Sequence, residues 1–124
     1  MRRQADWFRQ SRRKLESARW DIQGEFYEDA CFSAQQAAEL AAKALLESQG
    51  RIELGPSVYQ LLQAAGTAPP DALQAARVLD RYYIPTRYPN GFPAGAPMDY
   101  YDRSTAEEAV GHAQAILDFV AARL

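Results

Sequence analysis

The residues best suited to bind a ligand lie in a stretch that contains several prolines. Arg87 is the only charged residue within positions 84–98, and the neighbouring prolines restrict the backbone that carries it. A guanidinium held in this way presents a planar fork of N–H donors, which suits a phosphate group. Tyr88 can stack on a base, and Asn90 can bond to the edge of a base or ribose. The stretch therefore predicts a contact with a phosphate-bearing ligand.

A polar row in a predicted helix supplies possible partners for this site. Gln35, Glu39 and Lys43 follow one another at four-residue spacing, and Gln36 lies beside them. Glu39 precedes Lys43 in the order that favours an ion pair on a helix. The row has two interpretations, a solvated stripe or a polar seam that faces another helix or a ligand.

Two roles for Arg87 remain open. In the first, Glu39 and Lys43 orient its guanidinium toward a ligand, while Asp80 competes for it. In the second, Arg87 pairs with Glu39 or Asp80 and only fixes the loop to the rest of the chain. The predicted ligand-binding residues are Arg87, Tyr88, Asn90, Glu39, Lys43, Gln36 and Asp80.

The composition leaves few groups for metal or redox chemistry. One cysteine and one histidine allow no internal disulfide and no zinc-site spacing. Cys31 falls inside a predicted helix and is expected to be a buried packing residue. His112 falls inside the last predicted helix, where we expect a structural or surface role. No metal, cofactor or catalytic residue is predicted.

Hydropathy indicates an ordinary globular protein. Of the 124 residues, 48% are hydrophobic and 24% are charged, as in domains that bury a core without disulfides. No apolar run reaches membrane-spanning length, and no hydrophobic signal segment follows the first arginines. We therefore expect a cytoplasmic protein without membrane contact.

The charge is unevenly distributed along the chain. The first 19 residues contain two acidic residues and half of the fourteen basic ones, so this segment carries +5 and the remainder −7. Such a segment can hold phosphate backbones or an acidic protein surface. It can equally be a solvated face, or one that complements the acidic remainder of the fold. The basic residues are Arg2, Arg3, Arg9, Arg12, Arg13, Lys14 and Arg19.

The hydrophobic periodicity predicts an all-α, up-and-down bundle of about five helices in a single domain, residues 1–124. Residues 30–50 form the central and most buried helix, because small and apolar side chains recur at helical spacing over a broad face. The other helices are expected at about 3–23, 56–66, 71–83 and 104–124, and residues 84–102 form a long proline-rich loop before the last one.

Several residues carry more detailed expectations. Pro56 lies in the first turn of the third helix, Asp71 caps the fourth, and Ser104 with Glu107 forms a capping box for the last. Trp7 belongs to the inward stripe of the first helix, with Phe8 beside it. Trp20 falls off this stripe and is free to meet another element or a second subunit. The aromatic residues Phe26, Tyr27 and Phe32 are expected in the core.

Three segments together resemble the HEPN domain, the higher-eukaryote and prokaryote nucleotide-binding helical bundle. They are FSAQQAAELAAKALL at residues 32–46, GPSVYQLL at 55–62 and LDRYYIPTRYP at 79–89, and the alanine-rich last helix also fits. The resemblance spans nearly the whole chain. It implies a dimer, often encoded beside a minimal nucleotidyltransferase. Many members are RNases whose composite site forms across the dimer.

The chain departs from the catalytic members of this family at one motif. Those members have an arginine followed after a short spacer by a histidine, whereas positions 88–94 after Arg87 contain none. His112 is too far along the last helix, and Pro56 stands where relatives often have a histidine. RNA cleavage by a 2′-hydroxyl needs a base that titrates near neutrality.

Three functions follow as hypotheses. The first is a non-catalytic dimeric module that binds nucleotide or RNA, or docks a minimal nucleotidyltransferase in a toxin–antitoxin-like pair. The second is an RNase toxin that uses a base other than histidine. The third is a structural assembly subunit without a ligand.

Overall fold

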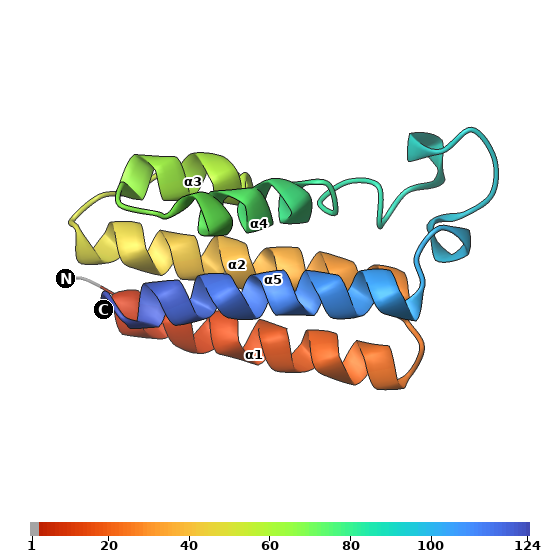
Figure 1. Cartoon of the computed structure of the whole chain (residues 1–124), viewed down its shortest axis with the longest axis horizontal. Helices are drawn as coiled ribbons and strands as arrows, with labels where there is room; N and C mark the ends of the chain where they lie inside the picture. Colours follow the sequence, from red (N-terminus) through yellow and green to blue (C-terminus); the bar gives the residue numbers. More distant parts are fainter. Residues whose placement is uncertain (1–2) are drawn as a thin grey trace.

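The computed structural model describes residues 3–124 and contains, within them, helices but no strand (Figure 1). This confirms the predicted all-α bundle. Arg2, counted above in the basic segment, lies outside the described residues. The elements in chain order are α1 (Gln4–Gln23), α2 (Tyr27–Ser48), α3 (Val58–Ala65), α4 (Pro70–Asp80), the short 3-10 helices η1 (Pro89–Gly91) and η2 (Pro97–Asp99), and α5 (Arg103–Ala121).

The three long helices lie side by side, and the two shorter ones cover them. α2 packs against α1 and α5, while α3 and α4 lie on the other side of α2 and α5 (Figure 1). The segment that contains η1 and η2 extends at the end of the bundle opposite the two termini (Figure 1). No helix of residues 3–124 is long and apolar enough to cross a membrane.

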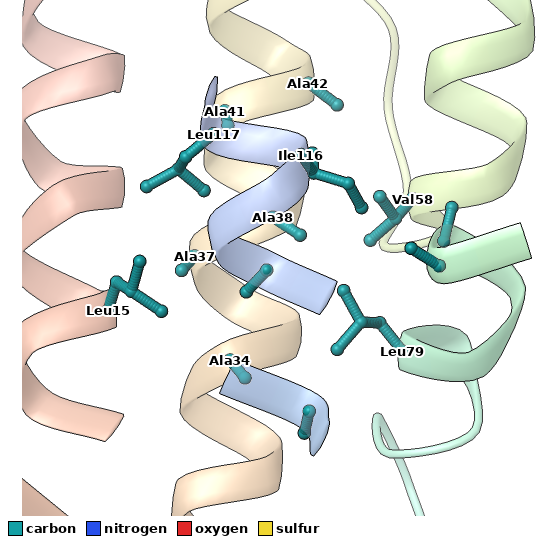
Figure 2. Packing of buried hydrophobic residues seen from close by; sticks show 14 of the residues in the cluster. Leu15, Ala34, Ala37, Ala38, Ala41, Ala42, Val58, Leu79, Ile116 and Leu117 are labelled. Atoms are coloured by element: carbon teal, nitrogen blue, oxygen red, sulfur yellow. The ribbon is translucent and has the colours of Figure 1, made fainter. Parts of the chain in front are cut away.

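α2 is the centre of the core, as predicted. Ala34, Ala37, Ala38 and Ala41 are fully buried, and Figure 2 shows them beneath α5 and beside α1. Alanine favours the helix and lets neighbouring backbones approach closely. The larger side chains that fill the remaining space come from the surrounding helices, among them Leu15, Val58, Leu79, Ile116 and Leu117 (Figure 2).

The ends of the first, central and third helices differ modestly from the predicted ones. α2 begins at Tyr27 rather than at residue 30, because Glu28 and Asp29 occupy its first turn, where acidic side chains oppose the positive helix end. α3 begins at Val58 after the cap Ser57, so Pro56 precedes the helix.

Two predicted helix caps are wrong. α4 begins at Pro70 after Pro69, and Asp71 lies in its first turn without capping it. α4 also ends at Asp80, three residues before the predicted end. α5 begins at Arg103, and the cap is Asp102 instead of Ser104, since the Asp102 carboxylate accepts a 2.9 Å bond from the Thr105 N–H. This bond lowers the pKa of Asp102.

Two aromatic residues lie outside the core in which the sequence places them. Phe8 is buried, whereas Trp7 is 36% exposed, because the buried face of α1 runs through Phe8, Ser11 and Leu15. The Ser11 hydroxyl donates a 2.6 Å bond to the Ala37 carbonyl and fixes this face against α2. Phe26 is 56% exposed at the α1–α2 junction.

Candidate functional site

The chain turns sharply after α4 and brings Arg87 back toward the bundle. The Arg87 N–H donates a 3.1 Å bond to the Ile84 carbonyl, and the hydroxyl of the buried Thr86 donates a 2.7 Å bond to the Tyr82 carbonyl. The Arg87 Nε then donates a 2.8 Å bond to the Tyr83 carbonyl. These local bonds order the loop without regular secondary structure and fix the base of the Arg87 side chain.

Three aromatic rings surround the Arg87 guanidinium. Its Cζ lies 4.5 Å from the ring centroid of Phe32, 4.7 Å from that of Tyr83 and 5.3 Å from that of Tyr88. Phe32 belongs to α2, so the contact joins the loop to the central helix. Cations are attracted to ring faces at these distances, and more so when partly desolvated. We call Arg87, Phe32, Tyr83 and Tyr88 the arginine cluster.

Within residues 3–124, the Arg87 guanidinium lies in no ion pair with a carboxylate. Of the two roles left open for Arg87, the structural ion pair with Glu39 or Asp80 does not form, because Glu39 bonds Lys43 and Asp80 bonds the start of α3. Arg87 is half-buried, and of its guanidinium nitrogens the Nε is the one bound in the turn. The aromatic rings carry no net charge, so the positive charge of Arg87 can still attract an anion.

The polar row of α2 is a seam rather than a solvated stripe. Glu39 accepts a 2.8 Å bond from the Lys43 ammonium, and their side chains are only 14% and 19% exposed. Glu39 also accepts longer bonds from Gln36 and the buried Gln35. Gln35 in turn donates a 2.9 Å bond to the Pro56 carbonyl. The seam thus fastens α2 to the segment that precedes α3.

Asp80 holds the start of α3. Its carboxylate accepts bonds from the Ser57 hydroxyl at 2.8 Å, the Val58 N–H at 2.7 Å and the Tyr59 N–H at 3.3 Å. A carboxylate at a helix N-terminus satisfies free N–H groups and opposes the helix dipole. Asp80 is thus committed to joining α3 to the end of α4.

A surface hollow adjoins the arginine cluster. It has a volume of about 380 Å³ and is lined by Pro56, Ser57, Asp80, Arg81, Tyr83, Ile84 and Pro85. Tyr83 belongs to both the hollow and the cluster. The hollow thus combines apolar side chains with one cation, the exposed Arg81, and one anion, the Asp80 carboxylate.

Of the other residues singled out from the sequence, Tyr88 lies next to Arg87, whereas Asn90 and His112 do not contact it. Tyr88 contacts Arg87 and is 47% exposed. Asn90 is exposed in η1, and none of the described contacts of Arg87 involves it. His112 lies on α5, where its Nε2 is 3.3 Å from the Glu108 carboxylate, in a hollow with Pro69, Asp71 and Phe119 rather than with Arg87.

Burial keeps the nucleophilic groups near α5 protonated. It raises the pKa of the Cys31 thiol and of the Tyr82 hydroxyl, each to about 12. Cys31 is buried, as predicted. Among residues 3–124 no group of histidine, cysteine, aspartate and glutamate side chains is arranged to hold a metal ion.

Two members of the arginine cluster are not among the predicted site residues. The sequence pattern places Phe32 in the core and Tyr83 in the apolar stripe of the fourth helix. A signal is present, since Phe32 lies four residues before Gln36 and therefore on the same face as the polar row. The contact itself depends on the turn after α4.

A family model described as the HEPN domain matches residues 4–123. The chain belongs to the HEPN family. Its structure resembles the crystal structure of TT1696 from Thermus thermophilus, with a TM-score of 0.97 and 45% identity over the whole of both chains.

Two further solved structures agree with this HEPN assignment. ST0689, an archaeal HEPN homologue, is 43% identical over 98% of both chains with a TM-score of 0.86. An HEPN domain protein from Thermotoga maritima, tm0613, is 32% identical, with a TM-score of 0.76 over 94% of this chain and 95% of that one. No curated protein matches the chain.

Proposed function

We propose that this HEPN chain is a non-catalytic, dimeric module that binds nucleotide or RNA through Arg87. The observation that carries the proposal is the guanidinium held against three rings and a backbone carbonyl, without an ion pair to any of residues 3–124. A cation fixed in this way has lost side-chain freedom before binding, which lowers the entropic cost of a phosphate contact.

The surroundings of Arg87 suit the other parts of a nucleotide. The half-exposed Tyr88 ring offers a face to a base, and bases stack on aromatic side chains in single-stranded RNA recognition. The hollow beyond Tyr83 has room for a planar group against its apolar side chains, and the Asp80 carboxylate in its lining is bonded to the start of α3. Arg81 at its edge supplies a second cation for a neighbouring phosphate.

The same geometry supports binding rather than cleavage. Removing the proton of a ribose 2′-hydroxyl needs a base within hydrogen-bond reach. His112 contacts Glu108 and lines another hollow, and the Glu39 carboxylate bonds Lys43 and Gln36 within the seam. An RNase toxin with a base other than histidine is the alternative, and a nuclease assay distinguishes it.

A second candidate function is the docking of a minimal nucleotidyltransferase partner. The proline-rich segment exposes Ile84, Tyr88, Met98 and Tyr100, each by 46% or more, and apolar groups gathered on a surface indicate protein contacts. Where a nucleotidyltransferase reading frame adjoins this one, co-expression should yield a complex that Met98→Asp weakens. A purified pair that stays separate would contradict this second candidate function.

Fluorescence anisotropy with a labelled single-stranded oligoribonucleotide tests the first proposal. Arg87→Ala should lose binding at least tenfold while its melting temperature stays within a few degrees. Arg77→Ala is the matched control, because Arg77 also stacks on a ring, that of Tyr59 at 4.4 Å, but lies outside the arginine cluster. Its affinity should match that of the wild type.

Other outcomes would contradict the proposal. Normal binding by Arg87→Ala together with a loss of several degrees in melting temperature would make Arg87 structural. RNA degradation by the wild type that Arg87→Ala lacks would establish the RNase alternative. A wild type that binds neither RNA nor nucleotide and has no partner would favour an assembly subunit without a ligand.

A further inference from the structure

The exposed side of α1 carries four arginines and a tryptophan. α1 lies at the edge of the bundle, where it packs against α2 and α5 (Figure 1). All five side chains are exposed, and that of Trp20 is 73% exposed, so this large ring takes no part in the core. We call Arg9, Arg12, Arg13, Arg19 and Trp20 the basic face.

Most of the charge on this face is not neutralised. Arg12, Arg13 and Arg19 form no ion pair with any of residues 3–124. The Cζ of Arg12 lies 5.1 Å from the ring centroid of Phe8, and Arg19 donates a 2.7 Å bond to the Gln114 side chain. Because neither neighbour carries a charge, these guanidinium groups can still attract an anion.

The acidic residues of α1 reduce this charge without cancelling it. Asp6 lies 3.7 Å from Arg9, but both side chains are more than half exposed, and such surface pairs contribute little. The other acidic residues of the helix are Glu16 and Asp21. With Lys14, α1 has five basic and three acidic residues, so it carries +2 whereas the whole chain carries −2. A basic surface of this kind attracts polyanions.

Trp20 indicates which polyanion fits the basic face. Residues spaced by three or four share one side of a helix, and the outermost row of α1 consists of Arg9, Arg13, Glu16 and Trp20. The row spans about 16 Å along the helix axis. In proteins that bind single strands, cations follow the phosphates while bases stack on aromatic rings. An acidic protein surface offers carboxylates to the arginines but no base to the ring.

We propose that the basic face is a second contact for single-stranded RNA, in which the arginines hold phosphates and Trp20 stacks on a base. This assignment rests on RNA as the ligand of the proposed function and names where the rest of a longer strand binds. The hollow beside Arg87 is lined by residues next to α3 and α4, which lie across α2 and α5 from α1 (Figure 1). A strand that reaches both surfaces gains affinity, because its second contact forms within the complex.

Two labelled RNAs separate the basic face from the Arg87 site in fluorescence anisotropy. An oligouridylate of about 20 nucleotides can reach both surfaces, whereas the dinucleotide UpU occupies one. The double variant Arg12→Gln, Arg13→Gln should bind the long strand more weakly, with a salt slope shallower by about 1.4, and bind UpU as the wild type does. Arg51→Gln, Arg77→Gln is the control, because it removes the same charge from exposed arginines beside α3. The control should bind both RNAs as the wild type does.

Tryptophan fluorescence locates the contact directly. Trp7 and Trp20 are the two tryptophans of the chain, so Trp7→Phe leaves Trp20 as the only one. The long oligouridylate should quench the emission of Trp7→Phe over the concentrations at which the anisotropy rises, and should change that of Trp20→Phe little. Trp20→Ala should bind the long strand at least about fivefold more weakly, with an unchanged circular dichroism spectrum because the ring is exposed.

Four outcomes would overturn one proposal or both. Wild-type affinity and slope in Arg12→Gln, Arg13→Gln, or an unquenched Trp20, would overturn the basic face. Polyglutamate that displaces the long strand as effectively as free oligouridylate would assign the face to an acidic protein instead. If Arg87→Ala bound UpU normally while the double variant lost the long strand, the Arg87 site would be wrong and the basic face would stand. A wild type that binds neither RNA would overturn both.

Discussion

Different interactions stabilise α2 and the segment between α4 and α5. α2 is a regular helix with twelve buried residues, and apolar packing surrounds it. The segment has only η1 and η2, and rings and turn bonds hold it. Phe92 stacks on Tyr100 with centroids 4.0 Å apart, and Tyr82 meets Tyr101 edge to face at 5.9 Å.

This difference determines where a charged side chain remains without an ion-pair partner among residues 3–124 and can bind a ligand. The charged residues on the half-buried face of α2 are neutralised, because Glu39 and Lys43 lie close enough to pair, and burial of an unpaired charge is costly. In the segment after α4, rings and one carbonyl stabilise Arg87. A candidate ligand-binding group therefore lies in the less regular region.

The largest predicted effect concerns the packing of α2. Leu45 is 3% exposed, so Leu45→Ala should lower the free energy of unfolding by about 2–5 kcal/mol, through lost burial and the cavity left behind. Urea denaturation followed by circular dichroism measures this. Met98→Ala, at an exposed position of the loop, should leave stability nearly unchanged. Equal losses in both variants would remove the distinction between the two regions.

An intermediate effect is expected where α4 passes into the loop. Asp80→Ala removes the acceptor of three bonds at the start of α3 and should cost about 1–3 kcal/mol. Asp71→Ala is the control, because Asp71 caps no helix, and its cost should be much smaller. RNA binding by Asp80→Ala should be retained in the folded protein. If the folded variant lost RNA binding, Asp80 would be part of the ligand-binding site.

The smallest effect on stability should come from the loop itself. Phe92→Ala removes the stack on Tyr100 and should cost about 1 kcal/mol. Limited proteolysis should then cut within residues 84–102 while the helical bundle stays resistant. A loss as large as that of Leu45→Ala would show that the segment belongs to the cooperative core.

The sequence predicts the bundle well because its signals are local and periodic. The alanine and leucine spacing of residues 30–46 persists over several turns, and this run is buried in the structure. The helix ends are predicted less well, since neighbouring residues compete to cap. Asp102 and Ser104 both have side chains that can cap a helix, and the path of the chain into α5 favours Asp102.

The candidate site is only partly predictable for a different reason. Arg87 stands out as a lone charge among prolines, but its neighbours depend on how the chain turns after α4. That turn places the Arg87 guanidinium against the rings of Tyr83 and Phe32. Asp80 instead accepts hydrogen bonds at the start of α3. Helical spacing relates residues on one helix and carries no information about contacts across such a turn.

The salt dependence of RNA affinity tests the role of Arg87 most directly. Each phosphate contact to a single strand adds about 0.7 to the slope of log affinity against log salt concentration. The slope for Arg87→Ala should therefore be shallower than that of the wild type by about 0.7, while Arg77→Ala keeps the wild-type slope. An affinity loss in Arg87→Ala with an unchanged slope would contradict a direct phosphate contact.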